Sequence, residues 1–201
     1  MRYRAPSVVC LLAVVALLPV GPVATADTKV NQPAAPNQID QTPPLVPIPD
    51  AHVTKTGLLV GGQPTAKHLE AIHRAGYRTV VSLRAEDEPG DEGERATVER
   101  LGMTFVSIPV PGPAGLTEDN ARALAKALDK IDALPAVVHC GTGQRASAML
   151  GLEAFVVDRV SAAAAIEIAK SLGMKRYEAA LRKRLAEICK ADKSRKCEDV
   201  P

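Results

Sequence analysis

At residues 135–145 the chain reads PAVVHCGTGQR, an apolar run followed by a loop with two glycines. An uninterrupted apolar run of this length is typical of a strand that is buried on both faces of a sheet. A helical pattern begins at Arg145 and continues to about Val160. The stretch therefore predicts a central strand, a tight loop and a helix in direct succession, as in a parallel α/β fold.

Strands and helices alternate before this unit, and only helices follow it. Earlier strands are predicted at residues 57–60, 78–83 and 103–110, with helices between them. The helix capped by Thr117 has apolar residues at the helical period, namely Ala121, Leu124, Leu128 and Ile131. Two further helices are predicted at residues 161–173 and 174–189. The prediction is a three-layer α/β fold, with a central, mostly parallel sheet of four or five strands flanked by helices and a helical C-terminal part.

The first residues have the three zones of a secretory signal. Arg2 and Arg4 precede an apolar run over residues 8–20, and small residues at 24–26 offer a cleavage site. The apolar run is shorter than the roughly 20 residues needed to span a bilayer. We therefore expect cleavage after residue 26, a periplasmic or secreted protein, and no stable membrane insertion once the signal (residues 1–26) is removed.

The remaining chain is predicted to hold one domain. Residues 27–52 are rich in proline and polar residues and predict an extended linker. The globular domain is expected over residues 53–190, followed by a polar tail over 191–201. The formal net charge of +2, with acidic and basic residues interspersed, gives no indication of a nucleic-acid partner.

Removal of the signal would leave three cysteines, Cys140, Cys189 and Cys197. In an oxidising compartment an odd number leaves at least one thiol unpaired. Cys189 and Cys197 are close in sequence, and a disulfide between them would anchor the tail and leave Cys140 free. The alternative that all three are unpaired stays open, because spacing does not fix disulfide geometry.

The loop from Cys140 to Arg145 has the residues of an anion-binding site. Its glycines allow successive backbone N–H groups to turn inward, and the following helix adds unpaired donors and its positive dipole end. This field stabilises a cysteine thiolate, and a guanidinium adds a fork of donors for two phosphoryl oxygens. We therefore predict Cys140 as the nucleophile. The predicted substrate-binding residues are Gly141, Thr142, Gly143, Gln144 and Arg145.

Two neighbouring residues are predicted to support this loop. His139 is expected to point away from the nest and to hold the loop rather than to carry a proton. Arg84 ends a predicted strand at the same sheet edge, where it would bind anions or pair with the acidic loop over residues 86–94. No metal or other cofactor is predicted, because the other histidines lack ligand spacing. An inert buried thiol at Cys140 is the alternative, but it leaves the two glycines and Arg145 without a role.

The motif resembles the signature of the protein tyrosine and dual-specificity phosphatases: His-Cys, a glycine three residues after the cysteine, then arginine and Ser147. The upstream stretches GQPT (62–65), TVVSLR (79–84) and IPV (108–110) resemble the bacterial beta-lactamase-hydrolase-like branch of that superfamily. The resemblance covers about residues 53–173. It implies a phosphatase-like fold, a nucleophilic Cys140 and a phosphate-binding Arg145. It leaves Ser147 either as a hydroxyl that helps the thiolate to leave or as an ordinary helix serine.

The spacing in the motif departs from the superfamily pattern. Four residues separate Cys140 from Arg145, whereas the pattern has five. The beta-lactamase-hydrolase-like branch shares the shorter spacing, and so do rhodanese-type sulfurtransferases, whose smaller loop holds a persulfide. A phosphoryl group needs more room than a single sulfur atom. A sulfurtransferase that carries a persulfide on Cys140 therefore remains an alternative.

The resemblance also implies an aspartate that protonates the leaving group, on the loop after the preceding strand. That loop, residues 111–116, has no carboxylate. Asp119 is the candidate, although acidic residues in a helical first turn are also favoured by the helix dipole. Asp87 or Glu88 could substitute.

The sequence thus predicts an exported cysteine-dependent phosphatase that hydrolyses a phosphate monoester through a phosphocysteine intermediate. The expected substrate is a phosphorylated small molecule or a phosphoprotein. The alternatives are the sulfurtransferase and a non-catalytic module that binds anions or phosphoproteins.

Overall fold

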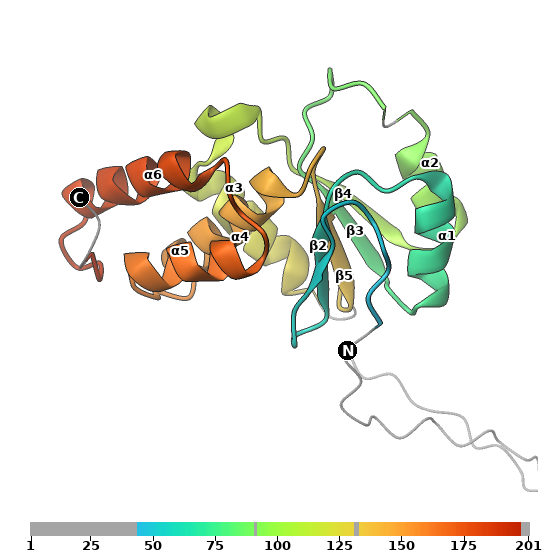
Figure 1. Cartoon of the computed structure of the whole chain (residues 1–201), viewed down its shortest axis with the longest axis horizontal. Coiled ribbons are helices and arrows are strands. Elements are labelled where there is room, and N and C mark those ends of the chain that lie inside the picture. Colours follow the sequence, from blue (N-terminus) through green and yellow to red (C-terminus); the bar gives the residue numbers. More distant parts are fainter. Residues whose placement is uncertain (1–43, 91, 131–132, 198–201) are drawn as a thin grey trace, which may run out of the picture. The chain divides into compact units, whose positions relative to one another are not determined.

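The computed structural model describes residues 44–90, 92–130 and 133–197, and Figure 1 shows how their helices and strands are arranged. The predicted signal, the linker up to residue 43, Ile131 and the last four residues of the tail lie outside these ranges. The strands are β1 (His52–Val53), β2 (Leu58–Gly61), β3 (Thr79–Ser82), β4 (Thr104–Ser107) and β5 (Ala136–His139). The helices are α1 (Ala66–Arg74), α2 (Glu94–Arg100), the 3₁₀ helix η1 (Gly112–Gly115), α3 (Glu118–Leu128), α4 (Gln144–Val156), α5 (Ala162–Ser171) and α6 (Glu178–Ala191).

The strands form one sheet in the order β1-β2-β5-β3-β4. Strand β1 pairs antiparallel with β2, and all other neighbours are parallel. Strand β5 lies in the centre, where Val138 pairs with Val60 on one side and Val81 on the other. The predicted α/β fold with a mostly parallel sheet is therefore confirmed, and β1 is a short addition that the sequence did not indicate.

The two faces of the sheet are covered by different helices, because successive residues of a strand point to opposite sides. Val60, Val81 and Val138 belong to the core that includes residues of α3, α4, α5 and α6. Leu59, Val80 and Val137 belong to the core on the other face, with residues of α1 and α2. Figure 1 shows these two groups of helices on opposite sides of the sheet.

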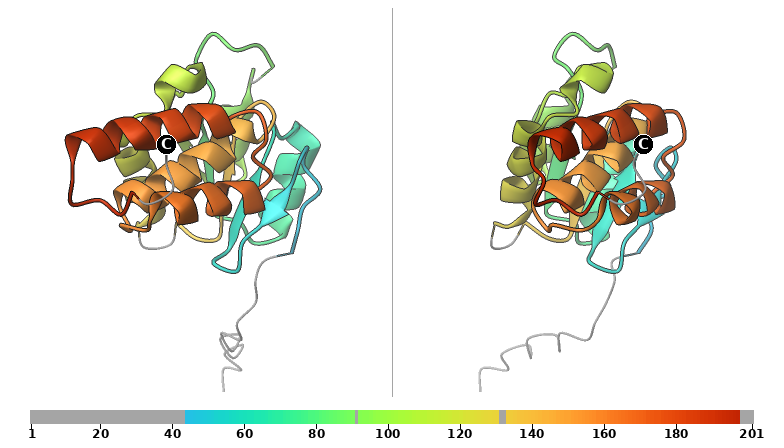
Figure 2. Two further views of the ribbon diagram at one scale, coloured as in Figure 1. Left: turned by 60° about the vertical axis from the view of Figure 1, so that its left-hand side comes forward. Right: turned by 90° about the vertical axis from the view of Figure 1, so that its left-hand side faces the viewer.

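Helix α4 is the centre of the helical C-terminal part. Figure 2 shows it between α5 and α6, and every residue of α4 except Glu153 is buried. A helix that is enclosed on all sides belongs to the interior of the domain. The loop from Cys140 therefore leads into the most firmly packed helix of the fold. Within the ranges given above, the structure contains no helix with the length and apolar character needed to cross a lipid bilayer.

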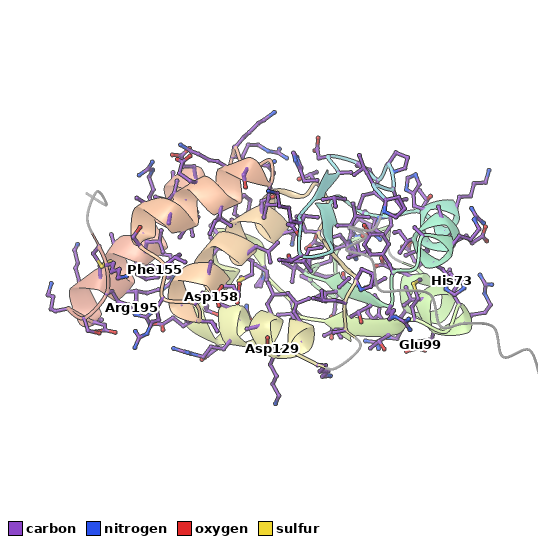
Figure 3. All side chains as sticks on the ribbon, turned by 90° about the horizontal axis from the view of Figure 1, so that it is seen from below. His73, Glu99, Asp129, Phe155, Asp158 and Arg195 are labelled. Carbon is purple, nitrogen blue, oxygen red and sulfur yellow. A yellow bond between two sulfur atoms is a disulfide. The ribbon has the colours of Figure 1, made fainter. Side chains whose placement is uncertain are left out.

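The C-terminal tail is attached to the domain at two points. Cys189 and Cys197 form a disulfide, and Cys140 is a free thiol. The guanidinium of Arg195 donates to the backbone carbonyls of Phe155 and Val156, at 2.8 and 3.1 Å. It also lies 5.2 Å from the centre of the Phe155 ring, and Figure 3 shows the two side chains together. Arg195 thereby satisfies carbonyl groups at the end of α4 that the helix itself leaves unpaired.

The packed chain begins before the domain start predicted at residue 53. Val46 and Ile48, inside the predicted linker, are 5% and 4% exposed and belong to the core on the α1 and α2 face. A Cβ atom at Gly61 would lie 2.7 Å from Cδ1 of Ile48. The glycine that ends β2 therefore makes room for this extended segment.

Candidate active site

The loops that follow β2, β3 and β5 meet at one edge of the sheet, because parallel strands in register end together. The backbone N–H of Leu83 donates to the carbonyl of His139 at 2.9 Å. The N–H of Cys140 donates to the carbonyl of Gly61 at 3.3 Å. Cys140 therefore lies where the ends of three strands converge.

Cys140 is 1% exposed and begins the loop that leads into α4. The N-cap of this helix is Gly143, with a φ of 77°, and no side chain caps the helix. The left-handed conformation favours glycine. The N–H groups of Gln144, Arg145 and Ala146 have no acceptor inside the helix. They point to the same end of α4 as the loop and are available to an anion beside Cys140.

The guanidinium of Arg145 is held by two carbonyl groups and by the carboxylate of Glu88. Nη1 donates to the carbonyl of Val110 at 3.0 Å and to Oε1 of Glu88, and it lies 3.5 Å from the carbonyl of Leu83. Nη2 donates to Oε2 of Glu88 at 2.6 Å. The hydrogen bond from Arg145 is the main cause that lowers the pKa of Glu88 from 4.5 to about 2. The same bond raises the pKa of Arg145, so both groups are charged at neutral pH.

Glu88 leaves one edge of the Arg145 fork free. A guanidinium carries five N–H donors, and Glu88 with Val110 occupies both donors of Nη1 and one of Nη2. In the part of the chain that the structure describes, the Nε–H and the second Nη2–H make no hydrogen bond. These two donors are parallel and fit two oxygens of a phosphoryl group. Glu88 thus orients the guanidinium, and its low pKa argues against a role as proton donor.

Arg84 is a second cation beside the loop; it contacts the acidic loop over residues 86–94 through Pro89, and its role in binding anions stays a prediction. It is 7% exposed, and it donates through Nη2 to the carbonyl of Pro89 rather than to a carboxylate. Its buried Nε has no hydrogen-bond partner. A Cβ atom at Gly141 would lie 3.9 Å from Nη1 of Arg84 and 3.6 Å from Nη2 of Arg145. Two guanidinium groups therefore approach the same point of the loop, where the absence of a side chain leaves space, and Oε2 of Glu88 lies 4.0 Å from that point.

His139 lies behind the loop and contacts an acidic residue that the sequence did not single out. Its Nε2 is 3.0 Å from Oε1 of Glu94, at the start of α2, and both side chains are enclosed. The two groups are not aligned for a hydrogen bond. The supporting position expected for His139 fits this burial. Ser147 is also buried, and its hydroxyl contacts the carbonyls of Gly143 and Leu172, at 2.9 and 2.6 Å, rather than the thiol.

Gln144 and Thr142 connect the loop to the segment between α5 and α6. The Gln144 side chain donates to the carbonyl of Gly173 and accepts from the N–H groups of Lys175 and Arg176. Gln144 was predicted to bind substrate, and its side chain instead uses its oxygen and one of its two amide donors to hold this segment. The hydroxyl of Thr142 accepts a hydrogen bond from Arg176. No feature of the sequence marked Arg176 as a neighbour of this loop.

The candidates for a general acid remain at the surface. Asp119 is exposed in the first turn of α3 and makes no hydrogen bond or ion pair with the residues that the structure describes. Asp87 is exposed in the loop after β3. The structure thus brings together Cys140, Arg145, Glu88 and Arg84, and Glu88, with its lowered pKa, is the carboxylate among these four residues.

The fold and this site define a member of the protein tyrosine and dual-specificity phosphatase superfamily. The family model described as "DSP-PTPase phosphatase fused to NAD+ Kinase" matches residues 50–187, and the chain belongs to that family. The beta-lactamase hydrolase-like protein of Xylella fastidiosa strain Temecula1 is 30% identical over 107 residues, which are 51% of this chain and 24% of that protein. Its counterpart in Agrobacterium fabrum strain C58 is 29% identical over 93 residues, 44% of this chain and 21% of that protein.

These matches confirm the resemblance to the beta-lactamase-hydrolase-like branch, although the chain spans only about a quarter of the length of these relatives. Among solved structures, a DUF442 protein of Shewanella putrefaciens CN-32 has a TM-score of 0.58 and 20% identity, over 74% of this chain and 92% of that one. TpbA of P. aeruginosa has a TM-score of 0.50 and 22% identity, over 69% of this chain and 91% of that one. At these identities the structures show a shared fold.

The ion pair between Glu88 and Arg145 predicts a pH dependence of stability. Because folding lowers the pKa of Glu88 from 4.5 to about 2, its contribution is fully present above pH 4.5 and is lost as the pH falls through 2. Glu88→Gln should therefore be less stable than the wild type at pH 7, and the difference should shrink steadily between pH 4.5 and 2. Urea unfolding at a series of pH values measures this.

Asp87→Asn is the matched control, because Asp87 is the exposed neighbouring acid in the same loop. It should change the unfolding free energy by less than about 0.5 kcal/mol at any pH. A Glu88→Gln variant with a constant stability difference across this range would contradict the assigned ion pair.

Proposed function

We propose that the protein is an exported phosphatase that hydrolyses a phosphate monoester through a phosphocysteine intermediate. The observation that carries the proposal is the free thiol of Cys140 at the start of a loop whose unpaired N–H groups lie beside the open edge of Arg145. Such an arrangement holds a phosphoryl group and stabilises the charge that moves onto its oxygens during transfer.

In the first step, the Cys140 thiolate attacks the phosphorus atom of the ester. An S–P bond forms and the P–O bond to the leaving group breaks, so the leaving oxygen takes the electron pair and needs a proton. Arg145 and the backbone N–H groups at the start of α4 bind the three remaining oxygens. Arg84 adds a second positive charge at the same place, where its buried Nε has no hydrogen-bond partner among the described residues.

In the second step, a water molecule attacks the phosphorus of the phosphocysteine. The new P–O bond forms as the S–P bond breaks, so the thiolate is restored and inorganic phosphate leaves after the water has lost a proton. The group that gave its proton in the first step accepts one in the second. Asp119 is our candidate for this group, since it lies in the first turn of the helix that follows the loop over residues 111–116. Its exposure means that it would have to approach the site with the substrate bound.

The comparisons support this proposal at the level of chemistry. The family is described as a phosphatase, and a variant of TpbA of P. aeruginosa has been crystallised in complex with pTyr. We propose by analogy that the substrate is a phosphorylated small molecule or a phosphoprotein. The chain contains no Trp and only two Phe, which favours a site without an aromatic-walled slot.

The nucleophile and its arginine are tested by substitution. Cys140→Ser should reduce the hydrolysis of p-nitrophenyl phosphate to background, because the hydroxyl is a far weaker nucleophile at neutral pH. Arg145→Lys keeps the charge but loses the fork, and it should lower kcat/KM by roughly a hundredfold or more. Released p-nitrophenol measures the rate, and cooperative unfolding transitions show that the variants fold.

The same samples test the alternatives to hydrolysis. Given thiosulfate and cyanide, a sulfurtransferase would form thiocyanate in a reaction that needs Cys140. Thiocyanate without phosphate release would replace the proposed phosphatase by a sulfurtransferase. If neither product forms and the protein still binds phosphate, the protein is a non-catalytic anion-binding module.

The proposed acid is tested by the choice of leaving group. Asp119→Asn should lower kcat about a hundredfold on phenyl phosphate, whose leaving oxygen needs a proton. It should have a much smaller effect on p-nitrophenyl phosphate, whose leaving group is a better anion. Asp87→Asn serves as the control and should leave both rates unchanged. Equal rates for Asp119→Asn and the wild type on phenyl phosphate would remove Asp119 from the mechanism.

Export is a separate part of the proposal and rests on residues 1–26 alone. Full-length protein made in a bacterial host should appear in the periplasmic or extracellular fraction with Asp27 as its first residue. N-terminal sequencing measures this directly. Intact protein that begins at Met1 and stays in the cytoplasm would show that the segment is not a cleaved signal.

A further inference from the structure

A short segment between α5 and α6, residues 173–176, is fastened to the active-site loop by one buried side chain. Gln144 is 7% exposed and donates through Nε2 to the carbonyl of Gly173 at 2.9 Å. Its Oε1 accepts from the N–H groups of Lys175 and Arg176, at 2.7 and 2.9 Å. Because all three bonds are made to the backbone, they fix the path of the segment and so the place from which the Arg176 side chain starts.

Arg176 extends from this fixed position to the rim of the loop. Its Nη2 donates to the Thr142 hydroxyl at 3.1 Å, two residues from the nucleophile. The side chain is exposed, and it forms no ion pair with any carboxylate in the part of the chain that the structure describes. The neighbouring acid at the start of α6, Glu178, is instead paired with Lys170 and Arg182. Arg176 therefore presents an uncompensated charge at the loop.

Tyr177 follows and shares the electrostatic environment of the site. It is half-buried and packs against the main core. Burial raises the pKa of its hydroxyl, and the charges of Arg145 and Cys140 act on it as well. Tyr177 therefore lies within electrostatic range of both Arg145 and Arg176.

The surface beside α6 also holds a cleft. A cleft of about 320 Å³ lies between η1 and α6 and is lined by Pro113, Ala114, Ala180, Lys183, Arg184 and Glu187. Pro113 is three residues beyond Val110, whose carbonyl accepts from Arg145. Ala180 is one helical turn beyond Tyr177. Of its two cations, Arg184 is paired with Glu187 at 3.0 Å, and Lys183 forms no ion pair with the residues that the structure describes.

We propose that Arg176 forms a second anion subsite, and that the substrate is a phosphate ester with a second phosphate group close to the one that reacts. The proposal deepens the phosphatase function and rests on it. Arg145 and Arg84 hold the reacting phosphate, and Arg176 holds the second phosphate at the rim. The fork of Arg176 suits a tetrahedral oxyanion, because only one of its donors is used by Thr142.

Binding of inorganic anions tests this without turnover. The protein is the Cys140→Ser variant, and the probes are phosphate, pyrophosphate and tripolyphosphate, titrated by calorimetry at constant ionic strength. We expect pyrophosphate or tripolyphosphate to bind at least about tenfold more tightly than phosphate, because the second phosphate gains a charge-assisted hydrogen bond. Adding Arg176→Gln should remove most of this preference, measured as the ratio of the Kd for phosphate to the Kd for the longer anion.

Lys175→Gln is the matched control, since it removes one positive charge from the adjacent exposed residue. It should leave the Kd ratio unchanged, and unfolding curves should show that both variants are folded. Equal effects of the two substitutions, or equal affinities for all three anions, would overturn the second subsite while phosphate binding still supports the phosphatase. If none of the three anions binds, the proposed phosphatase function falls as well.

Discussion

The ion pair between Arg145 and Glu88 is the interaction on which the site depends. The guanidinium of Arg145 joins the start of α4 to two other segments. It binds Glu88 in the loop after β3, and its Nη1 also contacts the carbonyl of Leu83, directly after β3, and that of Val110, in the segment after β4. The Arg145 side chain is 11% exposed. A buried cation without such partners would be strongly destabilising. The same contacts that satisfy the charge therefore fix the direction of its free edge.

This arrangement needs a rigid base, and the sheet provides it. Strand β5 is central and in register with both neighbours, so the position of His139 is fixed by hydrogen bonds on two sides. Helix α4 is enclosed by other helices and is held at its far end by Arg195. The loop between them has fixed ends and only four residues between Cys140 and Arg145. Little freedom remains for the N–H groups that would surround an anion.

The sequence predicted the parts of the fold and of the site that depend on local patterns. Apolar periodicity located the main strands and helices, whereas the two residues of β1 are too few to form a pattern. The order of Cys140, two glycines and Arg145 identified the loop. The partner of Arg145 was not predictable, because Glu88 is 57 residues away and is one acid among several in its loop. Gln144 was predicted to bind substrate, but its side chain holds the segment before α6, which only the packing of the helices reveals.

Three arginines lie around the loop, and one carboxylate among the described residues is paired with one of them. Arg84, Arg145 and Arg176 lie around the loop, and of these only Arg145 is paired with an acid among the described residues. A second carboxylate beside Arg84 would satisfy that buried cation and stabilise the protein without ligand. It would also compete with the oxygens of a phosphate for the same donors. A buried guanidinium whose Nε has no partner among the described residues is costly in the free protein, and the oxyanion that we propose as ligand would remove that cost. The incomplete pairing at this edge of the sheet is therefore what an anion-binding site requires, because the free energy withheld from folding becomes available for binding.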